Sequence, residues 1–260
     1  MRSAITYLLE RIIHDTPNFK GKTRACVALA RPVRGRPIRT AYGPRIECHL
    51  DDATNKAAVF GWYGDIIFNV VNKLQLGSAF IDIGANSGLF SIIAANAVGE
   101  NGKVYAFEPQ VSMFNVLKRN MHYNGLSGVT AINKAVSATS GEIGMSHLSA
   151  RHTGIARVDP DGKQRVRAIN LDADMPELLK TIGKRRLVIK IDVEGAEADV
   201  LNGMKTLLKH ASIVIVEIDD GNLRRFGVGR KNVYEIMEHH GFSPSVAVQS
   251  KHFDEIFMRQ

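Results

Sequence analysis

Small residues at alternate positions follow a short apolar run, and their spacing could build a ligand-binding turn. Residues 79–83 are apolar except for Asp82, and Gly84, Asn86 and Gly88 then lead into an apolar helical pattern. This order predicts a strand, a tight turn and a helix. Residues without a bulky Cβ let backbone N–H groups and the helix N-terminus approach a ligand, and Asn tolerates a left-handed conformation well. We therefore expect a nucleotide-like ligand to lie across this turn.

The spacing in the turn narrows the choice of ligand. The dinucleotide fingerprint G-x-G-x-x-G needs a glycine where this chain has Leu89. The pattern D-x-G-x-N-x-G instead resembles the first motif of class I methyltransferases, which use S-adenosylmethionine. A glycine-rich turn that binds nothing is the alternative interpretation.

We assign Asp82, Gly84, Asn86 and Gly88 to the cofactor site, and three further positions are expected to complete it. Glu108 follows the predicted strand 103–107, so its carboxylate is placed to accept hydrogen bonds from ribose hydroxyls. Tyr63 belongs to an aromatic group just upstream of the glycine turn, and it either lines the pocket or packs beneath it. Val136 ends the third predicted strand, 129–136, and we assign it to the cofactor site as well.

Charged residues interrupt a second apolar strand at every other position. Lys190, Asp192 and Glu194 project to one side if the strand continues through residues 187–197. A lysine in a buried strand is costly unless it is paired, and Asp192 would supply that pairing. We expect Asp192 to act as the base for an acceptor hydroxyl or as a metal ligand, with Lys190 keeping it charged and Glu194 as second choice. A buried ion-pair network that only shapes the loop is the alternative.

Histidines and further acids are also candidates for the chemistry. Residues 137–168 break the alternation of strands and helices and predict an antiparallel insertion, where His147 and His152 could reach an acceptor. The carboxylates that could hold a hard divalent cation are those of Asp192, Glu194, Glu217 and Asp219. Metal dependence therefore stays open.

The elements that must position these residues follow from the apolar periodicity. Helices are predicted over residues 2–14, 25–30, 66–74, 88–98, 111–123, 196–209 and 232–240. Strands are predicted over 79–83, 103–107, 129–136 and 213–217, a further strand opens the motif 187–197, and hairpins are predicted over 38–50 and 242–258. This alternation favours a parallel sheet with helices on both faces, in which the strand leading to Asp192 lies beside the strand of the glycine turn.

The composition is that of a globular chain with one strongly basic end. The chain has 260 residues, 45% of them hydrophobic, which suits one large α/β domain and argues against disorder. Residues 1–46 carry ten basic and two acidic residues, so this segment accounts for the whole net charge of +8. We expect a basic N-terminal extension (1–57) in front of a main domain (58–260), with residues 1–46 binding an anionic surface or acceptor. A merely solvated basic face is the alternative.

The sequence also bears on location. No apolar run is long enough to span a bilayer, and no secretory leader is recognisable at the N-terminus. Cys26 and Cys48 have neither a CxxC nor a zinc-ligand spacing. We expect a cytoplasmic protein, while a peripheral position at a membrane surface and the oligomeric state stay open.

The two motifs together resemble the FkbM family of class I methyltransferases. The matching stretches lie within residues 58–245, at 81–88, 106–109, 171–172, 189–197 and 216–218, and the K-I-D-V-E-G-A-E run is the most specific. The resemblance implies a Rossmann-like, doubly wound α/β fold whose mostly parallel seven-stranded sheet has an antiparallel edge hairpin. It also implies O-methylation with S-adenosylmethionine, often of a sugar hydroxyl in a glycan, glycolipid or glycosylated natural product. Gly64 and Asn170 depart from the family pattern, which leaves local details of the pocket open.

Three other functions are alternatives. An RNA or protein methyltransferase would dock through the basic segment 1–46, and the salt dependence of nucleic-acid binding would reveal it. A non-catalytic domain would bind the cofactor without turnover on any acceptor. An NAD-dependent oxidoreductase is disfavoured by Leu89.

Overall fold

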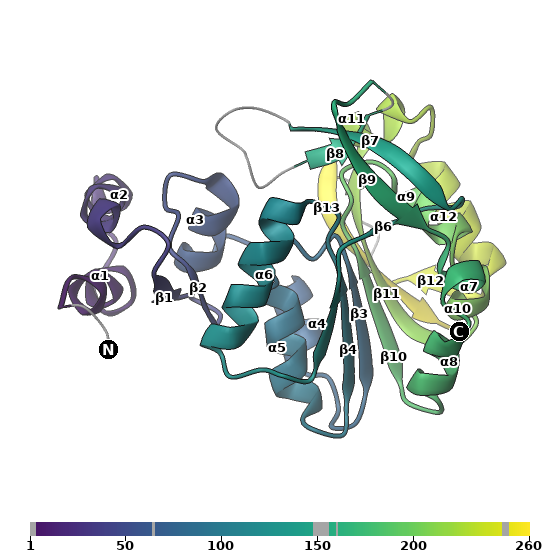
Figure 1. The fold of residues 1–260 in the computed structure, drawn as a ribbon, viewed down its shortest axis with the longest axis horizontal. Helices are drawn as coiled ribbons and strands as arrows, with labels where there is room; N and C mark the ends of the chain where they lie inside the picture. The colour runs from purple at the N-terminus through teal and green to yellow at the C-terminus, as the bar shows by residue number, and fades with distance from the viewer. Residues whose placement is uncertain (1–3, 64–65, 148–155, 160, 246–249) are drawn as a thin grey trace.

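A central sheet organises the molecule. The computed structural model describes the chain except for residues 1–3, 64–65, 148–155, 160 and 246–249. Within these described residues the central sheet has seven strands in the order β12-β13-β11-β10-β3-β4-β5. They are β3 (Ala79–Ile83), β4 (Lys103–Phe107), β5 (Val129–Ile132), β10 (Leu187–Ile191), β11 (Ala211–Asp219), β12 (Phe242–Pro244) and β13 (His252–Arg259). Only β13 runs antiparallel to its neighbours in this sheet, so the predicted Rossmann-like, mostly parallel sheet with an antiparallel edge hairpin is confirmed (Figure 1).

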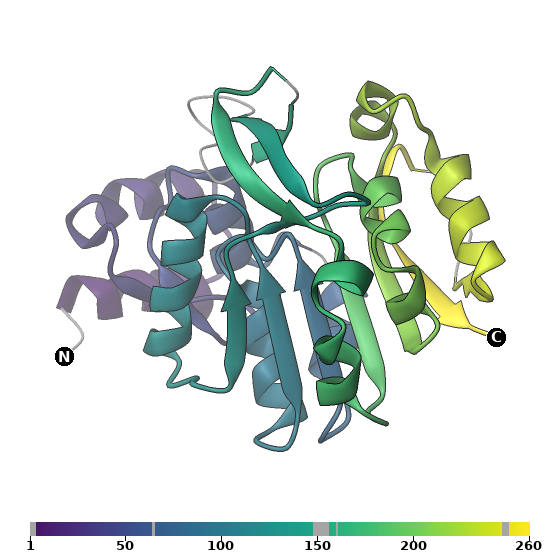
Figure 2. The ribbon, with the colours of Figure 1, turned by 45° about the vertical axis from the view of Figure 1, so that its right-hand side comes forward.

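Helices cover both faces of this sheet because successive strand residues point to opposite sides. Phe80 and Val188 belong to the core under α4 (Ile66–Asn72), α5 (Leu89–Val98) and α6 (Val111–Tyr123). Ile81 and Ile189 belong to the core on the other face. The helices there are α7 (Leu171–Asp174), α8 (Glu177–Ile182), α9 (Glu197–Asn202), α10 (Lys205–Leu208) and α12 (Arg230–His239), and α11 (Asp220–Arg225) follows β11. Figure 2 shows the two helical layers on either side of the strands.

A second sheet stands above the carboxyl ends of the central strands (Figure 2). Its order is β6-β9-β7-β8, from β6 (Ala135–Val136), β7 (Gly141–His147), β8 (Ala156–Val158) and β9 (Gln164–Ile169). β7 pairs antiparallel with both β8 and β9, which confirms the predicted antiparallel insertion. The single strand predicted over 129–136 is wrong, because the chain leaves the central sheet after β5 and β6 pairs with β9 instead.

The long helix predicted over 196–209 is also wrong. It divides into α9 and α10 at Gly203, where the backbone passes so close to a neighbouring loop that a Cβ would lie 2.0 Å from the carbonyl oxygen of Ser137. Apolar periodicity continues across such a break, so the sequence pattern could not reveal it.

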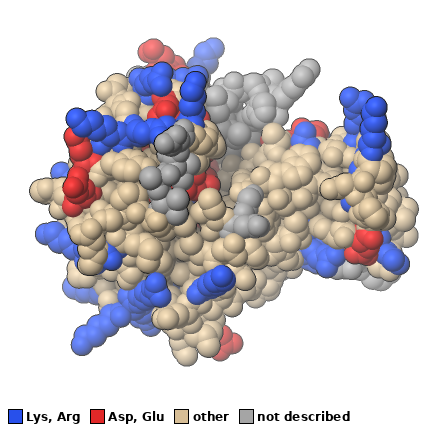
Figure 3. Space-filling model, turned by 180° about the vertical axis from the view of Figure 1, so that it is seen from behind, with Lys and Arg blue, Asp and Glu red and all other residues tan. Residues whose placement is uncertain are grey.

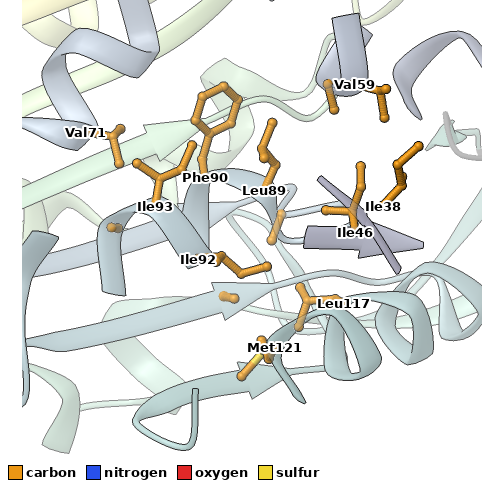
Figure 4. Close-up of a cluster of buried hydrophobic side chains, with 14 of the residues drawn as sticks. Ile38, Ile46, Val59, Val71, Leu89, Phe90, Ile92, Ile93, Leu117 and Met121 are labelled. Atoms are coloured by element: carbon orange, nitrogen blue, oxygen red, sulfur yellow. The ribbon is translucent and has the colours of Figure 1, made fainter. Parts of the chain in front are cut away.

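The N-terminal extension shares a core with the main domain. It comprises α1 (Ala4–Asp15), α2 (Lys22–Ala30), η1 (Arg31–Val33), β1 (Pro37–Arg39), β2 (Arg45–Glu47) and α3 (Ala53–Phe60). Ile38 and Ile46 on the predicted hairpin are buried in the same cluster as Leu89 and Leu117 (Figure 4). The boundary expected at residue 57 falls within α3, and the division into two units stays a prediction.

Hydrogen bonds tie this extension to the glycine turn. The N–H of Glu47 donates to Oδ1 of Asn120 at 2.8 Å, and Nδ2 of Asn120 donates to the carbonyl oxygen of Ser87 at 2.8 Å. Asn120 is fully buried on α6. One side chain therefore links the extension to the turn that follows β3.

Candidate functional site

A cavity of about 320 Å³ lies where the central strands end. Its wall includes the glycine turn after β3, Glu108 after β4, Asp192 after β10 and Glu217 on β11. Open α/β sheets bind their ligands at the carboxyl ends of the strands, and the volume suits a small molecule. Because β10 pairs with β3, the predicted neighbourhood of Asp192 and the glycine turn is confirmed.

The glycine turn runs directly against the end of β10. Gly84 has φ 80°, and a Cβ there would lie 1.8 Å from the carbonyl oxygen of Asp192. Asn86 has φ 51°, the left-handed conformation that its short polar side chain tolerates. Gly88 precedes α5 outside the cavity wall, and a Cβ there would lie 3.0 Å from Cγ of Leu117. Backbone packing therefore requires glycine at position 84, and the contact of α5 with α6 favours it at 88.

Two backbone donors fix Glu108 at the cavity. Its Oε2 accepts a hydrogen bond from the N–H of Asn86 at 2.9 Å, and its Oε1 accepts one from the N–H of Gln110 at 2.8 Å. Glu108 is only 4% exposed, and burial raises its pKa to about 7 although these hydrogen bonds act in the opposite direction. Each carboxylate oxygen keeps a second lone pair, so Glu108 can still accept a hydrogen bond from a hydroxyl in the cavity.

Lys190 lies between two acids. Its Nζ is 2.9 Å from Oδ2 of Asp192 and 3.7 Å from Oδ1 of Asp82. Asp82, one of the predicted cofactor residues, lies outside the cavity wall, and its Oδ2 accepts a hydrogen bond from Oγ of Ser91 at 2.6 Å. Burial alone would lower the pKa of Lys190, but the two carboxylates outweigh it and raise that pKa. The predicted pairing of Lys190 with Asp192 is thus present, and Asp82 is a second partner that the sequence pattern did not indicate.

Three carboxylates converge beside this pair. Asp192, Glu194 and Glu217 each place an oxygen within 4.8 Å of the others. Burial and the charges of Asp192 and Glu197 raise the pKa of Glu194 to about 7. Burial also raises the pKa of Glu217, and its Oε2 has no hydrogen-bond partner among the described residues. The cavity therefore holds more acidic groups than Lys190 can neutralise.

Glu194 belongs to this cluster from a turn and not from the strand, which the sequence pattern did not predict. The strand ends at Ile191, and Glu194 has φ 60° in the turn that follows. Its Oε2 accepts a hydrogen bond from Nδ2 of Asn222 at 2.8 Å. The expectation that the strand continues and aligns Glu194 with Lys190 on one side is therefore wrong.

His252 enters the cavity wall from the edge strand, and no sequence motif pointed to it. It is the first residue of β13 and pairs in register with Asp219, the last residue of β11. Its Nδ1 lies 3.0 Å from Oδ2 of Asp219, and its Nε2 lies 3.6 Å from Oε1 of Glu217. Burial would raise the pKa of Asp219, but hydrogen bonds from the N–H of Asn222 and from His252 lower it. Asp219 is therefore held as an ionised partner of the imidazole.

The remaining predicted residues take different positions. Tyr63 is part of the cavity wall, and its ring packs edge-on against Phe90 with 5.7 Å between the centroids. Val136 lines the cavity from β6. His147 belongs to β7, and His152 lies outside the described residues.

The groups on the wall fit S-adenosylmethionine, the cofactor that the sequence resemblance implies. Its sulfonium and ammonium groups are cations, and the wall carries the carboxylates of Glu108, Asp192 and Glu217. Its adenosine part offers hydroxyl and amine donors. The buried Oε1 of Gln110, a residue of the wall, has no hydrogen-bond partner among the described residues and is an acceptor for such a donor.

Comparison with known proteins agrees with this chemistry. The methyltransferase FkbM domain matches residues 82–244. The chain is 26% identical over 198 residues to the hexuronic acid methyltransferase AglP of Haloferax volcanii, and this match covers 75% of this chain and 76% of that protein. It is 27% identical over 173 residues to methyltransferase sdnD of Sordaria araneosa, and this match covers 55% of this chain and 66% of that protein. A solved SAM-dependent methyltransferase from Aquifex aeolicus is 16% identical with a TM-score of 0.45, and the alignment covers 80% of this chain and 94% of that one. Because the domain match spans more than half of the sequence, the chain belongs to the FkbM methyltransferase family and is an S-adenosylmethionine-dependent methyltransferase.

Proposed function

We propose that this methyltransferase methylates a hydroxyl oxygen of a sugar in a glycan, a glycolipid or a glycosylated natural product. The proposal rests on one observation, the proton-accepting groups of Asp192, Glu217 and His252 in the same cavity as the glycine turn. A neutral hydroxyl is a poor nucleophile, so a positioned proton acceptor speeds its reaction. The name of the relative from Haloferax volcanii, a hexuronic acid methyltransferase, supports a sugar as acceptor.

The glycine-turn side of the cavity would hold the cofactor. Glu108 would accept hydrogen bonds from the ribose hydroxyls, and the backbone at Gly84 and Asn86 would lie against the cofactor. Tyr63 and Val136 would contribute apolar wall on the same side. The bound sulfonium supplies an activated methyl group for in-line displacement. The protein's own task is then to align the acceptor oxygen and to receive its proton.

The acidity of the cavity favours a hydroxyl over a carboxylate as acceptor. Asp192, Glu194 and Glu217 would repel a uronate carboxylate at short range, whereas a hydroxyl can donate a hydrogen bond to any of them. A carboxylate is also nucleophilic without losing a proton, so it would make no use of these groups. We therefore expect a methyl ether as the product rather than a methyl ester.

The same carboxylates are of the type that hard divalent cations prefer. Chelation decides whether the reaction uses such an ion. A metal-assisted reaction stops in EDTA and resumes with Mg²⁺, whereas catalysis by protein groups alone continues.

Exposed cations on the N-terminal extension would recruit an anionic acceptor or surface. These cations, which form no ion pair within the described residues, are Lys20, Arg24, Arg31, Arg36 and Arg39. Figure 3 shows blue side chains on the lobe of the N-terminal helices, at the right of that view. None of the helices in the described ranges is long and apolar enough to cross a bilayer. Charge attraction between these cations and the anionic acceptor or surface would supply the contact.

Methyl transfer to a panel of sugars tests the proposal. Purified protein is incubated with methyl-labelled S-adenosylmethionine and p-nitrophenyl glycosides, the glucuronide and galacturonide beside neutral glycosides. We expect labelled product that survives mild alkali, because methyl ethers resist alkali and methyl esters hydrolyse. Label released by alkali would contradict a hydroxyl acceptor. Transfer only to added RNA or protein would support the rival methyltransferases, and cofactor binding without any transfer would support a non-catalytic domain.

A further inference from the structure

The pair formed by His252 and Asp219 is built by the sheet itself. The two residues face each other in the antiparallel register of β11 and β13, with Nδ1 of His252 3.0 Å from Oδ2 of Asp219. The other oxygen of Asp219, Oδ1, accepts a hydrogen bond from the N–H of Asn222 at 2.7 Å, which caps α11. Strand pairing and the helix cap therefore hold the carboxylate in place against the imidazole.

This arrangement determines which ring nitrogen carries the proton. An ionised carboxylate only accepts hydrogen bonds, so the hydrogen of the neutral imidazole must lie on Nδ1. Nε2 is then left with its lone pair. It makes no hydrogen bond with any described residue, since Oε1 of Glu217 lies 3.6 Å away. The side chain of His252 is 63% exposed and lines the cavity, so a substrate can reach this nitrogen.

We propose that His252 is the general base of the methyl transfer and that Asp219 is its positioning residue. The proposal rests on the proposed hydroxyl acceptor. Nε2 takes the proton of the hydroxyl while the oxygen bonds to the methyl carbon, the carbon–sulfur bond breaks, and its electron pair stays on sulfur. The products are a methyl ether, a neutral thioether and an imidazolium, and the proton later passes to solvent.

The acidic groups around His252 favour the imidazolium that forms in the step. Asp219 and Glu217 on β11 face His252, and Asp254 on its own strand and Glu194 in the turn after β10 interact with it electrostatically. These four acids stabilise the positive charge that forms in the step.

Kinetics of matched variants test the assignment on whichever p-nitrophenyl glycoside the panel identifies. His252→Ala should lower kcat by about 10²-fold or more, change cofactor affinity less than twofold, and regain activity when imidazole is added. His239→Ala removes an exposed histidine of α12 and should leave kcat unchanged. Asp219→Asn keeps an acceptor for the cap of α11 but forces the other tautomer of His252, so kcat should fall with little change in KM. Activity of His252→Ala within threefold of the parent, or a loss that imidazole does not restore, overturns the proposal.

A second measurement needs no acceptor and separates this proposal from the proposed function. Nitrogen-15 NMR of the imidazole should show the hydrogen on Nδ1 in the parent protein and on Nε2 in Asp219→Asn. A parent protein with the hydrogen on Nε2 would overturn the role of His252 as base, even if sugars are methylated. If no glycoside is methylated but the hydrogen lies on Nδ1, the sugar acceptor is wrong and the poised base is supported.

Discussion

Replacing Lys190 by methionine tests whether this residue is a structural cation. Lys190 is 2% exposed and compensates two carboxylates, those of Asp82 and Asp192. Methionine keeps the length and the apolar stem of the side chain and removes only the charge. The variant therefore leaves Asp82, which is 1% exposed, without a cation.

The size of the effect follows from this burial. Removing one partner of a buried ion pair costs about 3–5 kcal/mol, because the remaining charge is neither hydrated nor paired. For a chain of this length each kcal/mol corresponds to about 2–4 °C, so Tm should fall by about 6–20 °C. Asp192 is only partly buried and recovers some hydration, which places most of the cost on Asp82. Burial already raises the pKa of Asp82, so the loss should shrink as the pH falls and this carboxylate takes up a proton.

Thermal and denaturant unfolding of four proteins measure this prediction. Lys73→Met removes an exposed lysine and should change stability by less than about 0.5 kcal/mol. Adding Asp82→Asn to Lys190→Met should recover much of the lost stability, since it removes the uncompensated charge. A loss below about 1 kcal/mol in Lys190→Met, or a double variant no more stable than the single one, would refute the reasoning.

Three other outcomes are expected. Cofactor affinity should rise as the pH rises through about 7, because Glu108, whose pKa is about 7, then loses its proton and becomes an ionised acceptor. Glu108→Gln should remove this pH dependence and weaken binding by about 1–3 kcal/mol in calorimetry. Gly84→Ala should lower Tm and cofactor affinity because its Cβ would meet a carbonyl oxygen at 1.8 Å, whereas Gly128→Ala, where the space is open, should do neither. Neutralising the five exposed cations of the extension should abolish salt-sensitive retention on heparin and leave cofactor affinity unchanged; retention that persists would assign the basic surface another role.

Local sequence was sufficient to place the glycine turn and Glu108 at the cavity. Gly84, Asn86 and Glu108 lie in turns directly after strands, and their conformations follow from nearby residues and from the rule that parallel strands end at one edge. Asp192 could be placed next to them for the same reason. These predictions needed only the order of strands and helices.

The positions of His252 and Glu194 depend on contacts between distant segments. His252 meets Asp219 across 33 residues of chain, and which strand occupies the sheet edge cannot be read from periodicity. Glu194 has a positive φ in the turn after β10, and Gly195 follows it with a positive φ at a point where a Cβ would lie 2.7 Å from the carbonyl oxygen of Asn222. Such close approaches are set by tertiary packing, and the periodicity of the sequence does not reveal them.

The shared core of the extension and the domain has a consequence during synthesis. Leu9 on α1 belongs to the same buried cluster as Ile215 on β11. At about 5–20 residues per second, Leu9 leaves the ribosome about 10–40 seconds before Ile215 does. In that interval the apolar faces of the first helices lack part of the cluster that finally buries them. The growing chain must therefore carry an unfinished hydrophobic surface until its last third has been translated, and that surface is one that a ribosome-bound chaperone would cover.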